Sequence, residues 1–225
     1  MIYSGGKGIT FKKLINLMPP HETYIETHLG GGAVIRNKRP ARRNIGIEID
    51  PKVIEKWPEE ERRGIEIIQG DGVNFLKDYP FTGKGNEMVY CDPPYLRETR
   101  RRKRKFYIFE YTLQQHVELL EVIKTLPCMV MISGYESDLY KEMLKGWHIH
   151  TFQSKTHACV STEWLWMNYP PPVRLHDYRY LGDNYRERER IKKIKENWIS
   201  RFKSMAVLER QALLLAIDSV KEELE

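Results

Sequence analysis

The stretch Tyr24-Ile-Glu-Thr-His-Leu-Gly-Gly-Gly32 is the starting point for the fold. A short apolar run leads into a glycine cluster, and a segment with helical spacing follows, which predicts a strand, a tight turn and a helix. Glycine lets the backbone turn tightly and approach a ligand, and the free N–H groups of the following helix face that ligand. Glycine turns are common, however, so this stretch alone is equally compatible with a plain strand-to-helix connection.

The next predicted strand ends in an acidic residue. In Ile45-Gly-Ile-Glu-Ile-Asp50, Glu48 follows Gly30 by 18 residues. An acid about 20 residues after a glycine loop is placed to accept hydrogen bonds from the ribose hydroxyls of an adenosine-containing ligand. Glu48 is therefore a candidate ribose-binding residue.

Short apolar runs alternate with longer amphipathic ones, which predicts an α/β fold with a largely parallel sheet covered by helices. Seven strands are expected, at Tyr24–Glu26, Ile45–Ile49, Ile65–Ile68, Met88–Cys91, Met129–Ile132, His148–Phe152 and Trp164–Asn168. Helices are expected at Thr10–Leu17, after Gly32, and at Pro51–Trp57, Leu113–Thr125 and Ser137–Leu144.

The chain changes character at Pro170-Pro-Pro172, which can neither continue a strand nor enter a helix interior. Beyond it, apolar residues recur every three or four positions from Ile191 to Met205, and a second apolar-faced stretch covers Leu208–Val220. We therefore expect a sheet domain over residues 1–169 and a basic helical extension over residues 170–225, with two helices in a hairpin.

The excess positive charge is concentrated in one segment. The chain has 37 Lys and Arg against 31 Asp and Glu, a net charge of +6 and a pI near 9.1. Seven of the basic residues and one acid, Glu98, lie between residues 97 and 105, so the rest of the chain is neutral overall. The basic residues are Arg97, Arg100, Arg101, Arg102, Lys103, Arg104 and Lys105. This segment is a candidate for phosphate contacts, although a solvated surface run has the same composition.

A second basic candidate is the face of Arg186–Lys203, with eight basic and three acidic residues. A helix that packs its apolar side against the body shows charge outward regardless, so this signal is equally compatible with a structural role. Either segment would give the protein a nucleic-acid partner.

The cysteines and the hydropathy exclude several classes of protein. Cys91, Cys128 and Cys159 are widely spaced and form no C-x-x-C pair, which argues against a zinc site or a disulfide framework. No apolar run approaches the roughly 18 residues that a membrane span needs, and the N-terminus has no signal pattern. We expect a cytoplasmic protein that is not secreted and holds no metal.

The motif with the strongest chemical meaning is Asp92-Pro-Pro-Tyr95, directly after the apolar run Met88–Cys91. Pro93 and Pro94 stiffen the backbone at a strand's carboxyl end, where open α/β sheets bind ligands. The motif fixes a carboxylate, the Pro93 carbonyl and an aromatic face around one point. A planar heterocycle with an exocyclic amine fits this set, because the amine donates to Asp92 and to the carbonyl while the ring stacks on Tyr95.

With these motifs the chain resembles the Dam-like, D12 class of S-adenosylmethionine-dependent adenine-N6 DNA methyltransferases. The family's glycine–lysine motif, glycine loop and D-P-P-Y motif are matched in order by Tyr3-Ser-Gly-Gly-Lys7, Glu26–Gly32 and Asp92–Tyr95. Ser133-Gly-Tyr135 and Trp164-Leu-Trp-Met-Asn168 also match, so the resemblance covers residues 1 to about 169. It implies a Rossmann-like sheet of seven strands, the seventh antiparallel.

The resemblance also implies which residues form the site. The catalytic residues would be Asp92, Pro93, Pro94 and Tyr95. The residues around the cofactor S-adenosyl-L-methionine would be Tyr3, Lys7, Glu26, Gly30, Gly32, Glu48, Asp71 and Asp92, with Glu48 on the ribose and Asp71 beside the adenine.

The implied reaction needs neither a metal nor a covalent intermediate, because the sulfonium methyl is already activated and only has to be aligned with the adenine N6. Asp92 and the Pro93 carbonyl would stabilise positive charge that develops on N6. The target base would be flipped out or already unpaired, and Tyr95 would receive it.

The sequence departs from the family in two places. The family's E-P-F is E-T-H at Glu26–His28, and only 20 residues separate Asp71 from Asp92, which leaves no room for a target-recognition domain there. Methylation of RNA adenine, methylation of cytosine N4 and a noncatalytic nucleic-acid-binding subunit therefore stand as alternatives to DNA adenine methylation. Restriction-modification, viral and host roles are all compatible with the sequence.

Overall fold

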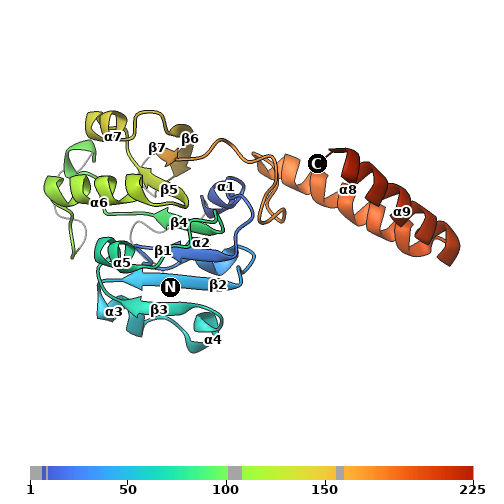
Figure 1. Ribbon diagram of the computed structural model, residues 1–225, viewed down its shortest axis with the longest axis horizontal. Helices are drawn as coiled ribbons and strands as arrows, with labels where there is room; N and C mark the ends of the chain where they lie inside the picture. Colours follow the sequence, from blue (N-terminus) through green and yellow to red (C-terminus); the bar gives the residue numbers. More distant parts are fainter. Residues whose placement is uncertain (1–6, 9, 101–107, 156–159, 225) are drawn as a thin grey trace. The chain divides into compact units, whose positions relative to one another are not determined.

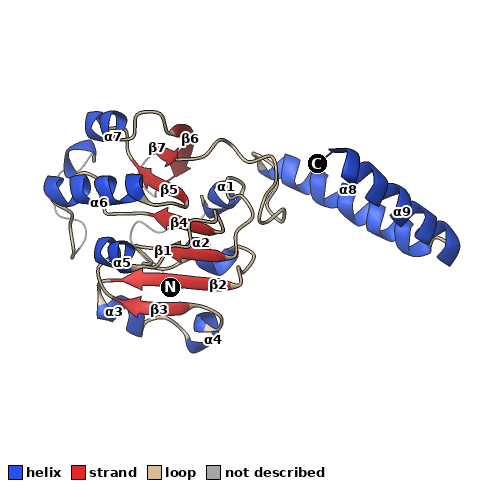
Figure 2. Ribbon diagram, in the orientation of Figure 1, coloured by secondary structure: helices blue, strands red, loops and turns tan. Residues whose placement is uncertain are grey.

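The computed structural model describes residues 7–8, 10–100, 108–155 and 160–224. The chain divides into two compact units, Met1–Tyr178 and Arg179–Glu225. The first unit holds a seven-stranded sheet with its covering helices, and the second holds two long helices (Figures 1 and 2).

All seven expected strands are present. They are β1 (Thr23–Glu26), β2 (Arg43–Glu48), β3 (Glu66–Gln69), β4 (Glu87–Cys91), β5 (Met129–Gly134), β6 (His148–Lys155) and β7 (Val160–Met167). The helices of the first unit are α1 (Phe11–Ile15), α2 (Ala33–Asn37), α3 (Pro51–Glu55), α4 (Glu59–Arg62), α5 (Gly72–Asp78), η1 (Arg97–Thr99), α6 (Leu113–Thr125) and α7 (Asp138–Met143). Those of the second unit are α8 (Tyr185–Ser204) and α9 (Val207–Leu224).

The strand order is β3-β2-β1-β4-β5-β7-β6. Strands β1 to β5 pair in parallel, whereas β7 runs antiparallel to both β5 and β6. The expected Rossmann-like sheet with an antiparallel seventh strand is thereby confirmed.

Strands β2 and β3 follow β1 on one side of the sheet, whereas β4 and β5 lie on its other side. The order of the strands therefore reverses between β1 and β4, and this point positions the site. These two strands are direct neighbours, with Glu26 opposite Tyr90. The backbone continues this pairing beyond β1, because the Thr27 N–H donates to the Tyr90 carbonyl at 3.1 Å. The glycine loop after β1 and the Asp92 motif after β4 therefore begin side by side, at the switch point where open α/β sheets bind ligands.

The core has two layers because successive strand residues point to opposite faces of the sheet. On β4, Val89 and Cys91 join one buried cluster with apolar residues of α5, α6 and α7. Met88 and Tyr90 are equally buried but lie outside that cluster, on the other face. The burial of apolar surface is the main stabilising contribution for such a core, and it contributes about 25 cal/mol for each Å² buried.

The first unit extends past the proline run at residues 170–172. His176 donates its backbone N–H to the Met18 carbonyl at 2.9 Å, and Asp177 accepts from the Arg39 N–H at 2.8 Å. These contacts tie the chain to the sheet unit as far as Tyr178.

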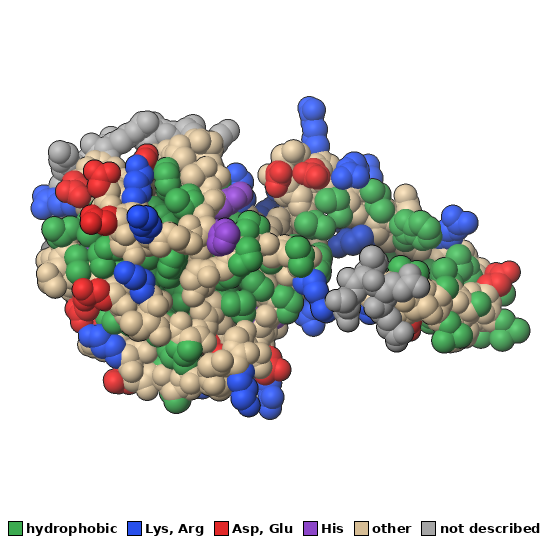
Figure 3. Space-filling view, turned by 45° about the horizontal axis from the view of Figure 1, so that its top comes forward, with side chains coloured by type: hydrophobic (Ala, Val, Ile, Leu, Met, Phe, Trp, Pro, Cys, Tyr) green, Lys and Arg blue, Asp and Glu red, His purple; other side chains and the backbone are tan. Residues whose placement is uncertain are grey.

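The second unit is a pair of helices, with the end of α9 beside the beginning of α8 (Figure 1). Asn184 caps α8 by accepting from the Glu187 N–H at 3.0 Å, but no residue of α8 is buried. Apolar side chains therefore appear on the surface of this unit among Lys and Arg (Figure 3). Neither of these helices, nor any other in the described ranges, is long and apolar enough to cross a membrane.

Candidate active site

The glycine loop is shaped by two positive backbone angles and by contacts from β2 and from Trp57, which follows α3. Gly30 and Gly32 have φ values of 50° and 60°, which favour glycine. A Cβ at Gly32 would lie 2.2 Å from the Trp57 ring, and the Trp57 indole N–H donates to the Gly30 carbonyl at 2.9 Å. The loop is thus held closely against Trp57.

Glu48 lies at the end of β2 and contacts this loop directly. One carboxylate oxygen accepts from the Gly30 N–H at 2.8 Å, and the other accepts from the Asp50 N–H at 2.9 Å. An ionised carboxylate has about four lone-pair sites, so it can still accept the two hydroxyls of a ribose. Burial raises the pKa of Glu48, while these backbone hydrogen bonds act in the opposite direction.

Lys7, Asp92 and Tyr95 are brought together as the motifs imply, and a fourth residue, Glu163, joins them. The Lys7 ammonium lies 2.7 Å from Asp92 Oδ1 and 3.3 Å from Glu163 Oε2. It also donates to the Tyr95 hydroxyl at 2.7 Å, and that hydroxyl donates to Glu163 Oε2 at 2.9 Å. Lys7 is only 6% exposed. We call these four residues the lysine cluster.

The sequence reasoning missed Glu163. It is one acidic residue in an otherwise apolar and hydroxyl-bearing strand, so no local pattern marks it. Its place follows from the antiparallel register, in which Trp164 pairs with Gly134 at the carboxyl end of β5. The beginning of β7 therefore lies at the same edge of the sheet as the Asp92 motif.

The two carboxylates of the lysine cluster have different environments. Burial raises the pKa of Asp92, against the opposing effect of Lys7. Burial acts on Glu163 in the same direction, but the Lys7 charge and hydrogen bonds from Ser154, Tyr95 and Lys7 outweigh it, so the pKa of Glu163 is lowered. Burial, Asp92 and Glu163 raise the pKa of Tyr95 well above 10, which keeps the phenol neutral.

Residues after β5 complete the surroundings of Tyr95. The Tyr135 ring lies edge-on at 4.7 Å between ring centroids. Ser133 Oγ and Tyr90 Oη share a buried hydrogen bond of 2.7 Å that joins β5 to β4. This edge-to-face packing against Tyr135 restrains the ring of Tyr95.

Glu26 and Asp71 each hold a neighbouring part of the fold, Glu26 from a buried position and Asp71 from a partly exposed one. Glu26 is 3% exposed and its Oε2 accepts from the Tyr24 hydroxyl and the Ile35 N–H, both at 3.0 Å. Burial raises the pKa of Glu26 to about 8. Asp71 caps α5 by accepting from the Asn74 N–H at 2.9 Å. Both residues support the elements beside the site, and a role on the cofactor stays a prediction.

Of the basic segment, the structure describes Arg97 and Arg100, while residues 101–105 lie outside the described ranges, as does Tyr3. Arg100 is 10% exposed and pairs with Glu110 at 2.7 Å. It also donates to the Tyr95 carbonyl. The Arg100 guanidinium thus connects Glu110 to the Asp92 motif, and its contact with phosphate stays a prediction.

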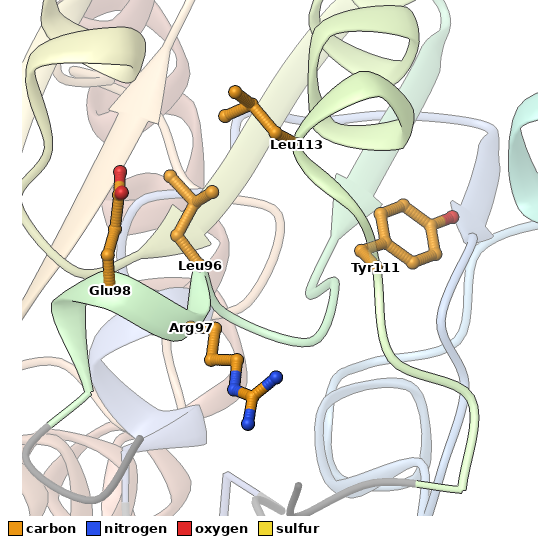
Figure 4. A pocket seen from close by; sticks show the side chains of 5 residues that line it. All are labelled: Leu96, Arg97, Glu98, Tyr111 and Leu113. Carbon is orange, nitrogen blue, oxygen red and sulfur yellow. The ribbon is translucent and has the colours of Figure 1, made fainter. Parts of the chain in front are cut away.

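A pocket of about 450 Å³ lies directly after the Asp92 motif, lined by Leu96, Arg97, Glu98, Tyr111 and Leu113 (Figure 4). The Tyr111 hydroxyl points away from Leu96 and Leu113. That hydroxyl shares a 2.8 Å hydrogen bond with His28, the residue that replaces the family's Phe.

The strand order, the glycine loop and the buried carboxylate after β4 together define a Rossmann-like methyltransferase that uses S-adenosylmethionine. Residues 48–158 match the family model described as D12 class N6 adenine-specific DNA methyltransferase, which identifies this stretch as a relative of that class. The match includes Glu48, Asp71 and Asp92, whereas Lys7, the glycine loop and Glu163 lie outside it.

Solved structures show similarity at low identity. TrmK of M. capricolum, in complex with S-adenosylhomocysteine, is 9% identical, with 96% of each chain covered and a TM-score of 0.46. NodS of Bradyrhizobium japonicum WM9 is 10% identical, covering 72% of this chain and 94% of that one, with a TM-score of 0.49. ChlM of Synechocystis PCC 6803, with bound S-adenosylmethionine, is 12% identical, covering 71% and 78%, with a TM-score of 0.47. Among curated proteins, none matches the chain.

Proposed function

We propose that the protein transfers a methyl group from S-adenosyl-L-methionine to the N6 amine of a flipped-out adenine in DNA. The observation that carries this proposal is the Asp92 motif at the switch point of the sheet, with Tyr95 held at 4.7 Å from Tyr135. The match of residues 48–158 to the D12 class supports the same acceptor.

Asp92 has the main chemical role. In the proposed reaction, Asp92 and the Pro93 carbonyl accept hydrogen bonds from the N6 amine and draw its lone pair out of conjugation with the ring. Their negative charge stabilises the positive charge that develops on nitrogen. Because burial raises the pKa of Asp92, this carboxylate is also placed to hold the proton that N6 loses.

The cofactor would be held along the ends of β1 and β2. The residues present fit it: Glu48 presents an ordered carboxylate for the ribose, and the positive φ angles of Gly30 and Gly32 let the loop turn beside that carboxylate. When bound, the cofactor supplies an electrophilic methyl on a positively charged sulfur. The carboxylates of the lysine cluster favour that charge.

The nucleic-acid contacts of the proposal fall on two basic surfaces. Arg97 borders the pocket after the catalytic motif, and the basic residues 101–105 follow it in the chain. The basic side chains of α8 form the other surface, since most of them are exposed. Removal of one phosphate contact should reduce the slope of log K against log salt concentration by about one.

RNA methylation is the second candidate, and one observation favours it. The chain between β3 and β4 contains only α5 and a short connection, so no recognition domain is inserted before the Asp92 motif. The chemistry of Asp92 acts on the exocyclic amine and does not read the sugar, so it suits an unpaired adenine in either nucleic acid.

A methyl-transfer assay with tritiated cofactor on duplex DNA, single-stranded DNA and RNA tests the proposal. We expect label on DNA with the wild-type protein and a loss of at least about 10³-fold with Asp92→Ala. Asp78→Ala is the matched control, because Asp78 is exposed at the end of α5. Label on RNA alone would favour the second candidate. Label on no substrate, with cofactor bound, would support the noncatalytic subunit instead.

A further inference from the structure

Glu163 is a buried acid at the edge of the sheet where the catalytic motif lies. It is 6% exposed and sits one residue beyond the Trp164–Gly134 pair that ends the contact of β7 with β5. Carboxylates are almost never buried to this degree unless they are paired. The groups that pair with Glu163 therefore indicate its role.

The contacts with Lys7 and Tyr95 involve the same oxygen atom, and Ser154 also donates a hydrogen bond to the Glu163 carboxylate. Glu163 Oε2 lies 3.3 Å from the Lys7 ammonium and accepts the Tyr95 hydroxyl at 2.9 Å. The same ammonium lies 2.7 Å from Asp92 Oδ1. One cation thus stands between two carboxylates, and the neutral Tyr95 links it to the second of them.

This arrangement leaves the lysine cluster with a net charge of −1. Without Glu163, the Lys7 charge would cancel that of Asp92, and the catalytic carboxylate would belong to a neutral ion pair. With Glu163 present, the ammonium is shared and one negative charge stays in a mostly buried site. An uncompensated charge in such a site is costly, so the cluster favours a cationic ligand.

The methyl donor has such a charge and its product does not. During transfer the sulfur–carbon bond breaks with its electron pair left on sulfur, and a nitrogen–carbon bond forms. The positive charge passes from sulfur to N6 and leaves as a proton. The thioether product S-adenosylhomocysteine is therefore one positive charge short of the substrate, while the rest of the molecule differs only by the methyl group.

We propose that Glu163 is a positioning residue that takes up the charge of Lys7, so that Asp92 stays negative and the site prefers the sulfonium cofactor over its thioether product. This inference rests on the methyltransferase function but not on the identity of the acceptor. It makes product release easier, because the charge that holds the substrate is no longer matched after transfer.

Calorimetric dissociation constants for S-adenosylmethionine and S-adenosylhomocysteine test it without any acceptor. In Glu163→Gln we expect the preference for the sulfonium form to fall by about tenfold, which is the effect of one partly screened charge at close range. Glu87→Gln is the matched control, because Glu87 is also buried, accepts from Thr82 and lies at the opposite end of β4. That variant should keep the wild-type preference.

Two further variants separate charge from hydrogen bonding. Glu163→Asp keeps the charge and should preserve the preference within about twofold, even if both affinities weaken. Tyr95→Phe removes the hydroxyl that donates to Glu163 and should likewise leave the preference unchanged. If Glu163→Gln does not fold, as judged by circular dichroism, Glu163→Asp still tests the charge, because a lost preference in this charge-retaining variant contradicts the proposal.

An equal loss of both ligands in Glu163→Gln, or no change in either, would overturn the proposal, as would loss of the preference in Glu163→Asp. A failure of the adenine acceptor assay would leave these binding constants unaffected, so the two proposals fail independently.

Discussion

The two compact units differ in which side chains they bury and which they expose. In the first unit, charged groups are buried: Lys7 and Glu163 are each 6% exposed, beside the catalytic motif. In the second, apolar groups are exposed: Trp198 is 59% and Leu208 is 82% exposed. The burial of charges therefore costs the first unit some stability. The second unit exposes apolar surface and has little core.

This difference separates the roles of the units. Buried charges must be paired by a well-packed surrounding, and that surrounding fixes their geometry to the precision that catalysis needs. Exposed side chains on α8 and α9 have no such surrounding. We therefore expect chemistry to depend on the first unit, and changes in the second to leave the cofactor site unaffected.

The largest contrast in stability is expected between two tryptophans. Trp166 on β7 is fully buried, so Trp166→Ala should lower the free energy of unfolding by about 3–5 kcal/mol. Trp198→Ala on α8 should lower it by less than about 1 kcal/mol, because most of that ring is exposed. Urea unfolding measures both. Equal effects would mean that the second unit has a core of its own.

The next largest difference in stability is expected between substitutions of Lys7 in the first unit and Lys195 in the second. Lys7→Met leaves two buried carboxylates without their cation and should cost about 3 kcal/mol at pH 7. The cost should shrink at pH 5, because one carboxylate takes a proton when the ammonium is gone. Lys195→Met changes an exposed residue of α8 and should shift stability by less than about 0.5 kcal/mol. A Lys7→Met variant as stable as wild type at pH 7 would contradict the claim that Lys7 pairs with the buried carboxylates of the lysine cluster.

Acid sensitivity should also belong to the first unit. Burial lowers the pKa of His21 and His28 to about 3 and that of His116 to about 4, whereas all three titrate near 6.5 when unfolded. The stability from their neutral forms is present above pH 6.5 and is lost as the pH falls toward 4 and then 3, at about 2 kcal/mol per histidine between pH 7 and 5. Residues 179–225 contain no histidine.

The variant His116→Gln should therefore reduce the loss of stability between pH 7 and pH 5 by about 2 kcal/mol, whatever it does to stability at pH 7. Thermal melts between pH 7 and pH 5 measure the slope. An unchanged slope would mean that His116 is already charged in the folded protein.

The sequence predicted the fold through periodicity, and it did so best where elements bury one face. The helix Leu113–Thr125 follows that rule, whereas inner strands such as β4 are buried on both faces and are marked by short continuous apolar runs. Two helices, α4 and α5, were not expected, since α4 has no buried residue and α5 begins at a glycine. The Asp71 side chain caps α5, whereas α4 has no side-chain cap and carries three acidic residues in its first turn, and periodicity records neither feature.

Within the site, the residues in contiguous motifs were predictable and those placed by long-range contacts were not. Asp92 and Tyr95 share one tetrapeptide, and Glu48 follows a known spacing. Glu163 enters the site only through the antiparallel register of β7. The ion pair of Arg100 with Glu110, ten residues later, is likewise a contact that the basic run does not reveal.

Identification of the methylated nucleoside tests the central claim most directly. DNA incubated with labelled cofactor at saturating concentration would be digested to nucleosides and separated. The account predicts label in N6-methyldeoxyadenosine with the wild-type protein and none with a folded Asp92→Ala variant. Label in N4-methyldeoxycytidine, or equal label with Asp92→Ala, would contradict it.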